Sequence, residues 1–192
     1  MSVAKAEPGY PLEMRTFSPQ RATRGDIVLS YAADVAPAMS PRRPGPSYDL
    51  RGAGGGFGGA FFSFLLLPAD VPADFKLDWD LSAASPGARG VSTLGEGAVS
   101  LYGPTGGINT VFLLGGAVQG YAPPGERFSA YWIGRPPFDP QAASAWSARS
   151  YRVLQDQFAD PDAPPYVLLM RPFARPRDGG GATQGGFMLE YG

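Results

Sequence analysis

Alternating hydrophobic and polar residues predict two strands in the first half of the chain. Every second residue from Ile27 to Val35 is apolar, and the intervening positions include Ser30 and Asp34. Side chains two residues apart share one face of a strand, so residues 26–35 and 75–81 are both predicted to be half-buried strands. In the second segment the expected inward side chains are Phe75, Leu77, Trp79 and Leu81, and the expected outward ones are Lys76, Asp78 and Asp80.

Shorter apolar runs between glycines and prolines predict further strands. The continuous apolar run at residues 60–67 predicts either a strand buried on both faces or a short core helix. The preceding glycine run, residues 52–59, is interpreted as a flexible or tightly turned connection where backbones pass closely. Several short strands separated by turn signals are typical of a β-sandwich. The other predicted strands are residues 48–51, 98–102, 110–114, 118–121 and 128–133.

The apolar spacing changes from that of a strand to that of a helix after Gly134. Asp139 suits an N-cap and Pro140 suits the first helical position, so a helix is predicted from there to Ala159. A buried strand at residues 166–170, a glycine run at 179–181 and a last strand at 187–191 follow. The helical residues expected to face the core are Ala143, Trp146, Val153, Leu154 and Phe158.

These elements predict a mainly β protein, in which a β-sandwich is followed by a short α+β extension with one helix and edge strands. The first predicted domain is β-sandwich-like and covers residues 1–134. The second covers residues 135–192 and consists of a helix and two strands.

Composition excludes several kinds of chemistry, because the sequence contains no histidine and no cysteine. Zinc sites use mainly imidazole and thiolate ligands, and catalytic triads need an imidazole that accepts a proton. We therefore expect no catalytic residue, no metal ligand and no cofactor in this chain. A net charge of −1 gives no electrostatic basis for binding nucleic acid. We also expect no membrane span and no signal peptide, and the compartment stays open.

Three features suggest other functions. Residues 54–59 have the spacing of a dinucleotide-binding loop, but the apolar run that follows is too short for the required helix. Asp78 and Asp80 share a strand face, which suits a carboxylate-only hydrolase, although alternating charges on a wet face explain them better. Tyr131 faces away from its neighbour Trp132 and is the candidate contact of a stand-alone β-sandwich binding module for a glycan or peptide.

Several motifs follow one another in an informative order. They are 25–31 (Gly-Asp-Ile-Val-Leu-Ser-Tyr), 48–51 (Tyr-Asp-Leu-Arg), 76–82 (Lys-Leu-Asp-Trp-Asp-Leu-Ser), 128–134 (Phe-Ser-Ala-Tyr-Trp-Ile-Gly), and 166–171 (Tyr-Val-Leu-Leu-Met-Arg) with the glycines 179–181 after it. Their order resembles the amino-terminal part of a gluzincin metallopeptidase of the glycyl-aminopeptidase group. In such enzymes a β-sandwich precedes a thermolysin-like domain, whose edge strand follows a glycine-rich motif and binds the substrate backbone. An H-E-x-x-H helix then supplies two zinc ligands and the general base.

The resemblance implies a non-catalytic amino-terminal segment that ends before the zinc-binding helix. It also implies that the sandwich is incomplete at its start, because such a sandwich has further strands before the one predicted at Asp26. Such a segment contributes scaffold or substrate-cleft residues, with a downstream catalytic domain or chain as its partner and a peptide as the substrate of the completed enzyme. The family motif reads Gly-Gly-Leu-Glu-His, and its acidic residue anchors the substrate amino group. In this chain the acidic position is occupied by Thr183, which has no carboxylate. The implied substrate-binding residues are Gly180, Gly181, Ala182, Thr183 and Gln184.

Overall fold

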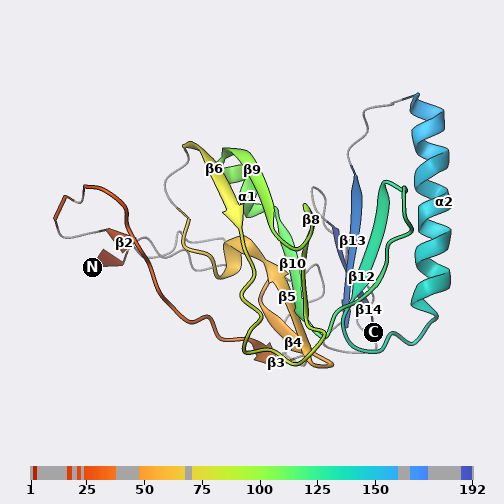
Figure 1. The fold of residues 1–192 in the computed structure, drawn as a ribbon, viewed down its shortest axis with the longest axis horizontal. Helices are drawn as coiled ribbons and strands as arrows, with labels where there is room; N and C mark the ends of the chain where they lie inside the picture. Colours follow the sequence, from red (N-terminus) through yellow and green to blue (C-terminus); the bar gives the residue numbers. More distant parts are fainter. Residues whose placement is uncertain are drawn as a thin grey trace. The chain divides into compact units, whose positions relative to one another are not determined.

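The computed structural model describes residues 2–3, 17–18, 21–22, 24–37, 48–67, 71–159, 165–172 and 187–191. The chain divides into two compact units, Met1–Ala33 and Asp34–Gly192. In the first unit β1 (Ser2–Val3) pairs antiparallel with β2 (Phe17–Ser18). The second unit holds the remaining strands and helices (Figure 1), which confirms a mainly β fold with one long helix.

The strand predicted at residues 26–35 is wrong. These residues belong to no strand, and Ile27, Val28 and Leu29 are mostly exposed. An alternating pattern becomes a strand only where a neighbouring strand can satisfy its backbone groups. The residues that do pair come directly afterwards, in β3 (Ala36–Pro37). β3 is an edge strand, the position in a sheet that tolerates a proline.

Six strands form the central sheet, in the order β3-β4-β5-β10-β7-β8. Of the two interpretations of the glycine run 52–59, the tightly turned one is confirmed: Gly54 and Gly55, with positive φ angles, form the turn of the β4–β5 hairpin. Close packing requires glycine at Gly56, because a Cβ there would lie 2.6 Å from Ile133 Cγ2. The bounds are β4 Arg51–Ala53, β5 Gly56–Ala60, β7 Arg89–Ser92, β8 Gly95–Glu96 and β10 Phe112–Gly116.

The apolar run at 60–67 is not a strand buried on both faces, and the predicted short core helix is confirmed only as one 3₁₀ turn. Ala60 ends β5, and the 3₁₀ helix η1 (Phe61–Ser63) follows it. The Ser63 hydroxyl donates a 2.7 Å hydrogen bond to the Ala60 carbonyl, which closes this turn. The run therefore leaves the central sheet and divides its phenylalanines between two clusters: Phe61 and Phe64 face the β6–β9 sheet, whereas Phe62 packs with Tyr48 in the cluster on the other face.

A separate two-stranded sheet consists of β6 (Pro72–Leu77) and β9 (Val99–Pro104), paired antiparallel. The predicted alternation at residues 75–81 is confirmed, because Phe75, Leu77, Trp79 and Leu81 are half-buried while the charged residues between them are exposed. The strand itself begins three residues earlier and ends at Leu77. The short helix α1 (Thr105–Asn109) follows β9.

The third sheet has the order β11-β12-β13-β14. β12 runs parallel to β13, and the helix α2 (Pro140–Phe158) connects them. The predicted N-cap is confirmed, because the Asp139 carboxylate accepts hydrogen bonds from the Gln141 and Ala142 amides at 2.9 and 3.1 Å. The strand bounds are β11 Gln119–Tyr121, β12 Phe128–Trp132, β13 Tyr166–Pro172 and β14 Phe187–Tyr191.

These elements of the second unit stack as four layers, joined by three hydrophobic clusters (Figure 1). Phe61, Ile108 and Leu113 pack between the β6–β9 sheet and the central sheet. Phe112 and Leu114 of the central sheet meet the β11–β14 sheet. Trp132, Phe128 and Met170 fill the layer between that sheet and α2. The central sheet is therefore covered on both faces, which explains why β10 is buried along four consecutive residues.

Candidate functional site

The predicted substrate-binding residues, Gly180, Gly181, Ala182, Thr183 and Gln184, lie outside the described residues. The structure does describe the two strands that flank them, β13 and β14. These strands pair in parallel, from Leu168 beside Phe187 to Pro172 beside Tyr191, and β14 is the last strand in the order of the sheet. The edge strand predicted after the glycine run is thus confirmed, while the substrate-binding role of the segment stays a prediction.

Arg171 joins β13 to the central sheet. Its side chain is 1% exposed, and Nη1 donates hydrogen bonds of 2.6 Å to the backbone carbonyls of both Asp49 and Gly58. Nη2 lies 3.4 Å from Asp49 Oδ1. Hydrogen bonds from a charged donor are the stronger class, so Arg171 fixes the strand that leads into the predicted substrate segment. Sequence reasoning missed this role, although an arginine at the end of a buried apolar strand itself indicates a buried polar contact.

A second buried arginine meets the same carboxylate. Arg51 Nε donates a 3.0 Å hydrogen bond to Asp49 Oδ2, and its side chain is 3% exposed. Among the described residues, Arg51 Nη1 and Nη2 have no hydrogen-bond partner. Among the described residues, the cluster therefore brings two buried guanidinium groups to one carboxylate.

The apolar side of α2 points the opposite way from the prediction. Ser144 and Ala148 are buried against the β11–β14 sheet, whereas Trp146 is 63% and Val153 is 64% exposed. The large side chains in this layer, Trp132 and its neighbours, come from the sheet. The helix therefore packs against the sheet with small residues. Trp146 and Val153 are seven residues apart and share one side, which Leu154 extends. We call Trp146, Val153 and Leu154 the outer face of α2.

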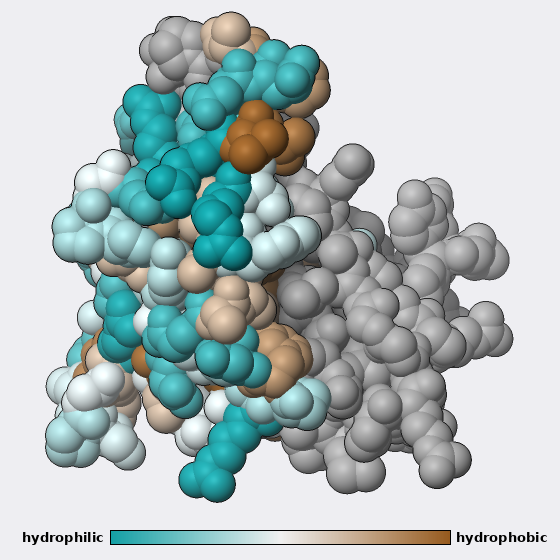
Figure 2. Space-filling model, turned by 90° about the vertical axis from the view of Figure 1, so that its right-hand side faces the viewer, coloured by the Kyte–Doolittle hydropathy of each residue, from teal (hydrophilic) through white to brown (hydrophobic). Residues whose placement is uncertain are grey.

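Figure 2 looks at the molecule from the side of α2 in Figure 1 and shows apolar side chains exposed among hydrophilic ones. A surface helix normally has one apolar stripe and a polar opposite side. α2 instead has a small-residue side that packs on the sheet and a second apolar side made of large residues. Exposed apolar surface of this kind marks sites of contact with other protein.

Tyr131, the candidate contact of a stand-alone binding module, is buried, with 4% exposure. The expectation that it lies on the surface is wrong, because the β12 face on which it lies packs on the central sheet. Arg89 and Glu96 form a two-pronged ion pair at 2.6 and 2.7 Å beside it, and Arg89 Cζ lies 5.2 Å from the centre of the Tyr131 ring. Hydrogen bonding from Arg89 lowers the pKa of Glu96, and burial raises the pKa of the Tyr131 hydroxyl.

The two aspartates considered for a hydrolase each have a local partner. Asp78 Oδ2 lies 3.0 Å from Lys76 Nζ, and both side chains are more than 60% exposed. Asp80 accepts a hydrogen bond from the Ser82 amide, and its hydrogen bonds with Ser82 lower the pKa of this carboxylate. A general acid needs a raised pKa, so this arrangement favours turn formation and solubility over acid catalysis.

Within the described ranges, no group of three or more acidic residues gathers in a way that would hold a metal ion. Of the helices in those ranges, none has both the length and the apolar character that crossing a membrane demands.

The comparisons with known proteins give a likeness of fold. No protein-family model matches the sequence, and no curated protein is similar to it in sequence. Among solved structures, an aminopeptidase N family protein from Idiomarina loihiensis matches with a TM-score of 0.52 and 15% sequence identity. The match covers 74% of this chain, which spans about a quarter (26%) of the length of that protein. The chain therefore has a fold similar to part of an aminopeptidase N family protein.

Proposed function

We propose that this chain is a non-catalytic, amino-terminal segment of an aminopeptidase-like metallopeptidase of the glycyl-aminopeptidase type. It acts as a scaffold and contributes to the substrate cleft, without a zinc site of its own. The motif order, the fold likeness and the absence of histidine and cysteine from the 192 residues support this proposal. In the proposed arrangement residues 1–134 form the sandwich-like domain and residues 135–192 begin the catalytic lobe.

The observation that carries the proposal is the outer face of α2. Trp146 and Val153 leave more than 60% of their surface in water, and Leu154 leaves 53%. A helix with apolar residues on two sides is stabilised when a further layer covers the second side. The proposal supplies that layer as the remainder of a catalytic lobe, which the chain meets as a downstream domain or as a separate chain.

The contribution to the cleft rests on the β13–β14 pair. Arg171 fixes one end of β13 through the carbonyls of Gly58 in β5 and of Asp49 just before β4, and β14 lies at the edge of its own sheet. An edge strand presents unpaired backbone groups that can bind an extended peptide. Residues Gly180 to Gln184 lie between these strands in sequence, and Thr183 offers a hydroxyl where the family has a carboxylate. The proposed segment therefore binds the peptide backbone without an ionic anchor for its amino group.

The coding sequence on the 3′ side of codon 192 gives the first test. The proposal expects a reading frame there, in phase or shifted, that encodes H-E-x-x-H. A 3′ sequence with no such motif in any frame would contradict it.

The second test measures association by sedimentation velocity. The polypeptide encoded by that frame is expressed separately and mixed with this chain. We expect a complex that the double change Trp146→Gln with Val153→Gln disrupts. Arg152→Gln is the matched control, because Arg152 is exposed and lies about 120° around α2 from Trp146. A complex equally insensitive to both variants would contradict the role of the outer face of α2.

A further inference from the structure

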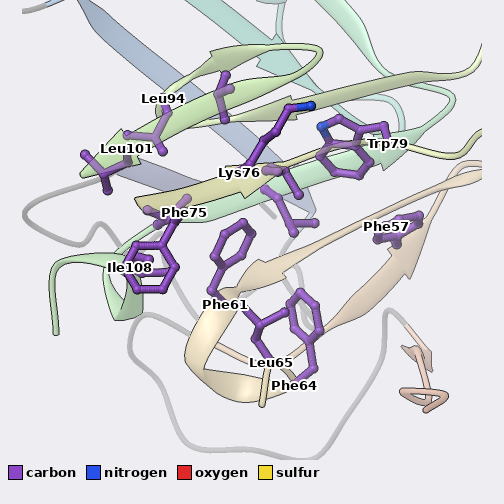
Figure 3. Close-up of a pocket in the computed structure, with 14 residues that line it drawn as sticks. Phe57, Phe61, Phe64, Leu65, Phe75, Lys76, Trp79, Leu94, Leu101 and Ile108 are labelled. Carbon is purple, nitrogen blue, oxygen red and sulfur yellow. The ribbon is translucent and has the colours of Figure 1, made fainter. Parts of the chain in front are cut away.

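An apolar cavity lies between the β6–β9 sheet and the central sheet. Its volume is about 310 Å³, and its lining comes from β5, β6, β9, β10, α1 and the segment around η1. Figure 3 shows Phe61 and Phe64 entering from that segment and Phe75 from β6. Lys76 is the one charged residue that the structure describes in the lining, and its ammonium lies on the exposed face of β6, 3.0 Å from Asp78 Oδ2. The chemistry of this space therefore suits apolar side chains.

The sheet that covers this cavity has only two strands. In the described part of the chain no further strand pairs with β6 or β9, so each of them has a free edge. A free edge presents unpaired N–H and C=O groups that another strand can bind. Side chains alternate across β6, with Phe75 and Leu77 towards the cavity and Lys76 towards solvent. A third strand that is apolar on one side and polar on the other would extend this sheet over the cavity.

Residues 26–35 have the pattern that such a strand needs, although they belong to no strand in the structure (Figure 1). Ile27, Leu29 and Tyr31 alternate with positions that include Ser30 and Asp34. Ile27 and Leu29 each leave 62% of their surface exposed. Strict alternation over this length is typical of a strand that packs with one face against a core.

The size of the cavity agrees with the bulk of two of these side chains. If a carbon with its hydrogens takes about the volume of a water molecule in the liquid, about 30 Å³, the cavity holds about ten such atoms. That is close to the bulk of two branched aliphatic side chains such as Ile27 and Leu29. A shift of one residue in the pairing would turn Ser30 and Asp34 inward instead, so the apolar cavity also selects the face of the strand.

We propose that two copies of this chain exchange strands: residues 26–35 of one copy pair with a free edge of the β6–β9 sheet of the other and place Ile27 and Leu29 in its cavity. The unpaired segment and the free edge belong to the same polypeptide, so two copies complete each other and the assembly closes as a two-fold dimer. Ten extended residues span about 33 Å, which lets the segment reach a second copy from its own β3. This contact is independent of the proposed peptidase function, because it involves neither α2 nor the β13–β14 pair.

Sedimentation velocity of the purified 192-residue chain over a range of concentrations tests the dimer. We expect a reversible dimer that Leu29→Asp weakens by at least about tenfold, because burying one aliphatic side chain changes an equilibrium constant by more than that factor. Val28→Asp is the matched control: it adds the same charge to the same segment, but Val28 is 88% exposed and lies on the opposite face. It should change the dimer dissociation constant by about twofold or less. Both variants should keep the circular dichroism spectrum of the wild type, since both side chains are exposed in the single copy.

Disulfide cross-linking tests the place of contact, because the chain has no cysteine of its own. A Leu29→Cys chain is mixed and oxidised with a Leu77→Cys chain or with a Leu101→Cys chain, and the products are identified by mass. We expect a covalent heterodimer with the one of these two that lies on the pairing edge. Tyr102→Cys is the control, since Tyr102 is 70% exposed on the outer face of β9 and its cysteine, although more accessible, should cross-link less.

Four results would overturn the proposal. The first is a chain that stays monomeric at every concentration, and the second is a dimer that Leu29→Asp and Val28→Asp weaken equally. The third is a dimer that Trp146→Gln with Val153→Gln abolishes, because the contact would then be made by α2. The fourth is a Leu29→Cys chain that also carries Leu77→Cys or Leu101→Cys and closes its disulfide within one chain at high dilution, because the segment would then pair with its own copy.

Discussion

Replacing Arg171 with methionine tests the connection between β13 and the central sheet. Arg171 Nη1 donates hydrogen bonds of 2.6 Å to Asp49 and Gly58, which lie 122 and 113 residues away in the sequence. Methionine fills much of the same volume but donates nothing. Hydrogen bonds to a charged group contribute about 1.5–3 kcal/mol each, so the loss of two predicts about 3–6 kcal/mol less free energy of unfolding. The expected value is near the lower end, because the variant no longer buries a charge.

Arg51→Met is the matched control, since Arg51 is equally buried and meets the same carboxylate. It makes one hydrogen bond, from Nε, and leaves Nη1 and Nη2 without partners among the described residues. Its removal also takes one buried charge out of the protein, so we expect a loss of about 1 kcal/mol or less. Urea unfolding at pH 7, followed by circular dichroism, measures both values. A loss below 1 kcal/mol for Arg171→Met, or a larger loss for Arg51→Met, would refute the reasoning.

Three further predictions concern other parts of the second unit. Gly90→Ala places a methyl group against the Trp79 ring, so urea unfolding should show a loss of about 1–3 kcal/mol together with a shift of tryptophan fluorescence. An unshifted spectrum would show that Trp79 does not rest on Gly90. Trp146→Ala should change the stability by about 0.5 kcal/mol or less, since the side chain is 63% exposed, whereas Trp132→Ala, at 2%, should cost about 3–5 kcal/mol. A larger loss of stability for Trp146→Ala than for Trp132→Ala would place Trp146 in the core. Glu96 has a pKa below its ordinary 4.5 in the folded protein, so its contribution is present above pH 4.5 and is lost as the pH falls through the folded value. Because the Arg89–Glu96 ion pair is partly exposed, Glu96→Gln should lower the free energy of unfolding by about 1 kcal/mol or less at pH 7. The difference in stability between this variant and the wild type should shrink towards pH 3. A difference that grows on acidification would contradict the direction of the pKa shift.

Elements defined by local sequence were predicted well. The alternation at residues 75–81, the Asp139-Pro140 start of α2 and the last strand at 187–191 all depend on nearby residues, and the structure confirms them. The start of α2 combines a helical spacing with a cap, so little is left there for distant contacts to decide.

Features that depend on distant contacts were not predictable. Residues 26–35 have the period of a strand but no partner strand, and the second half of the glycine run is the buried strand β5 because Ile133 and other neighbours leave no space for side chains. The direction of α2 was misjudged for a similar reason. A helix with apolar residues on two sides can pack with either side against a sheet. Because β12 contributes large side chains to this layer, α2 packs with its small residues.

The candidate site was only partly accessible to sequence reasoning. The flanking strands of residues 180–184 are where the pattern predicted them, and the role of the segment itself stays a prediction. The buried cluster of Arg171, Asp49 and Arg51 was missed because its members are brought together by the packing of two sheets. The cavity under β6 and β9 was missed too, since an empty space leaves no mark on the sequence.

Zinc content and peptidase turnover, measured together on the purified 192-residue chain, test the central claim most directly. Equilibrium dialysis against zinc and hydrolysis of aminoacyl-anilides should both stay at background, because the sequence offers no imidazole or thiolate for the metal. Stoichiometric zinc, with turnover that a chelator abolishes and added zinc restores, would contradict the claim.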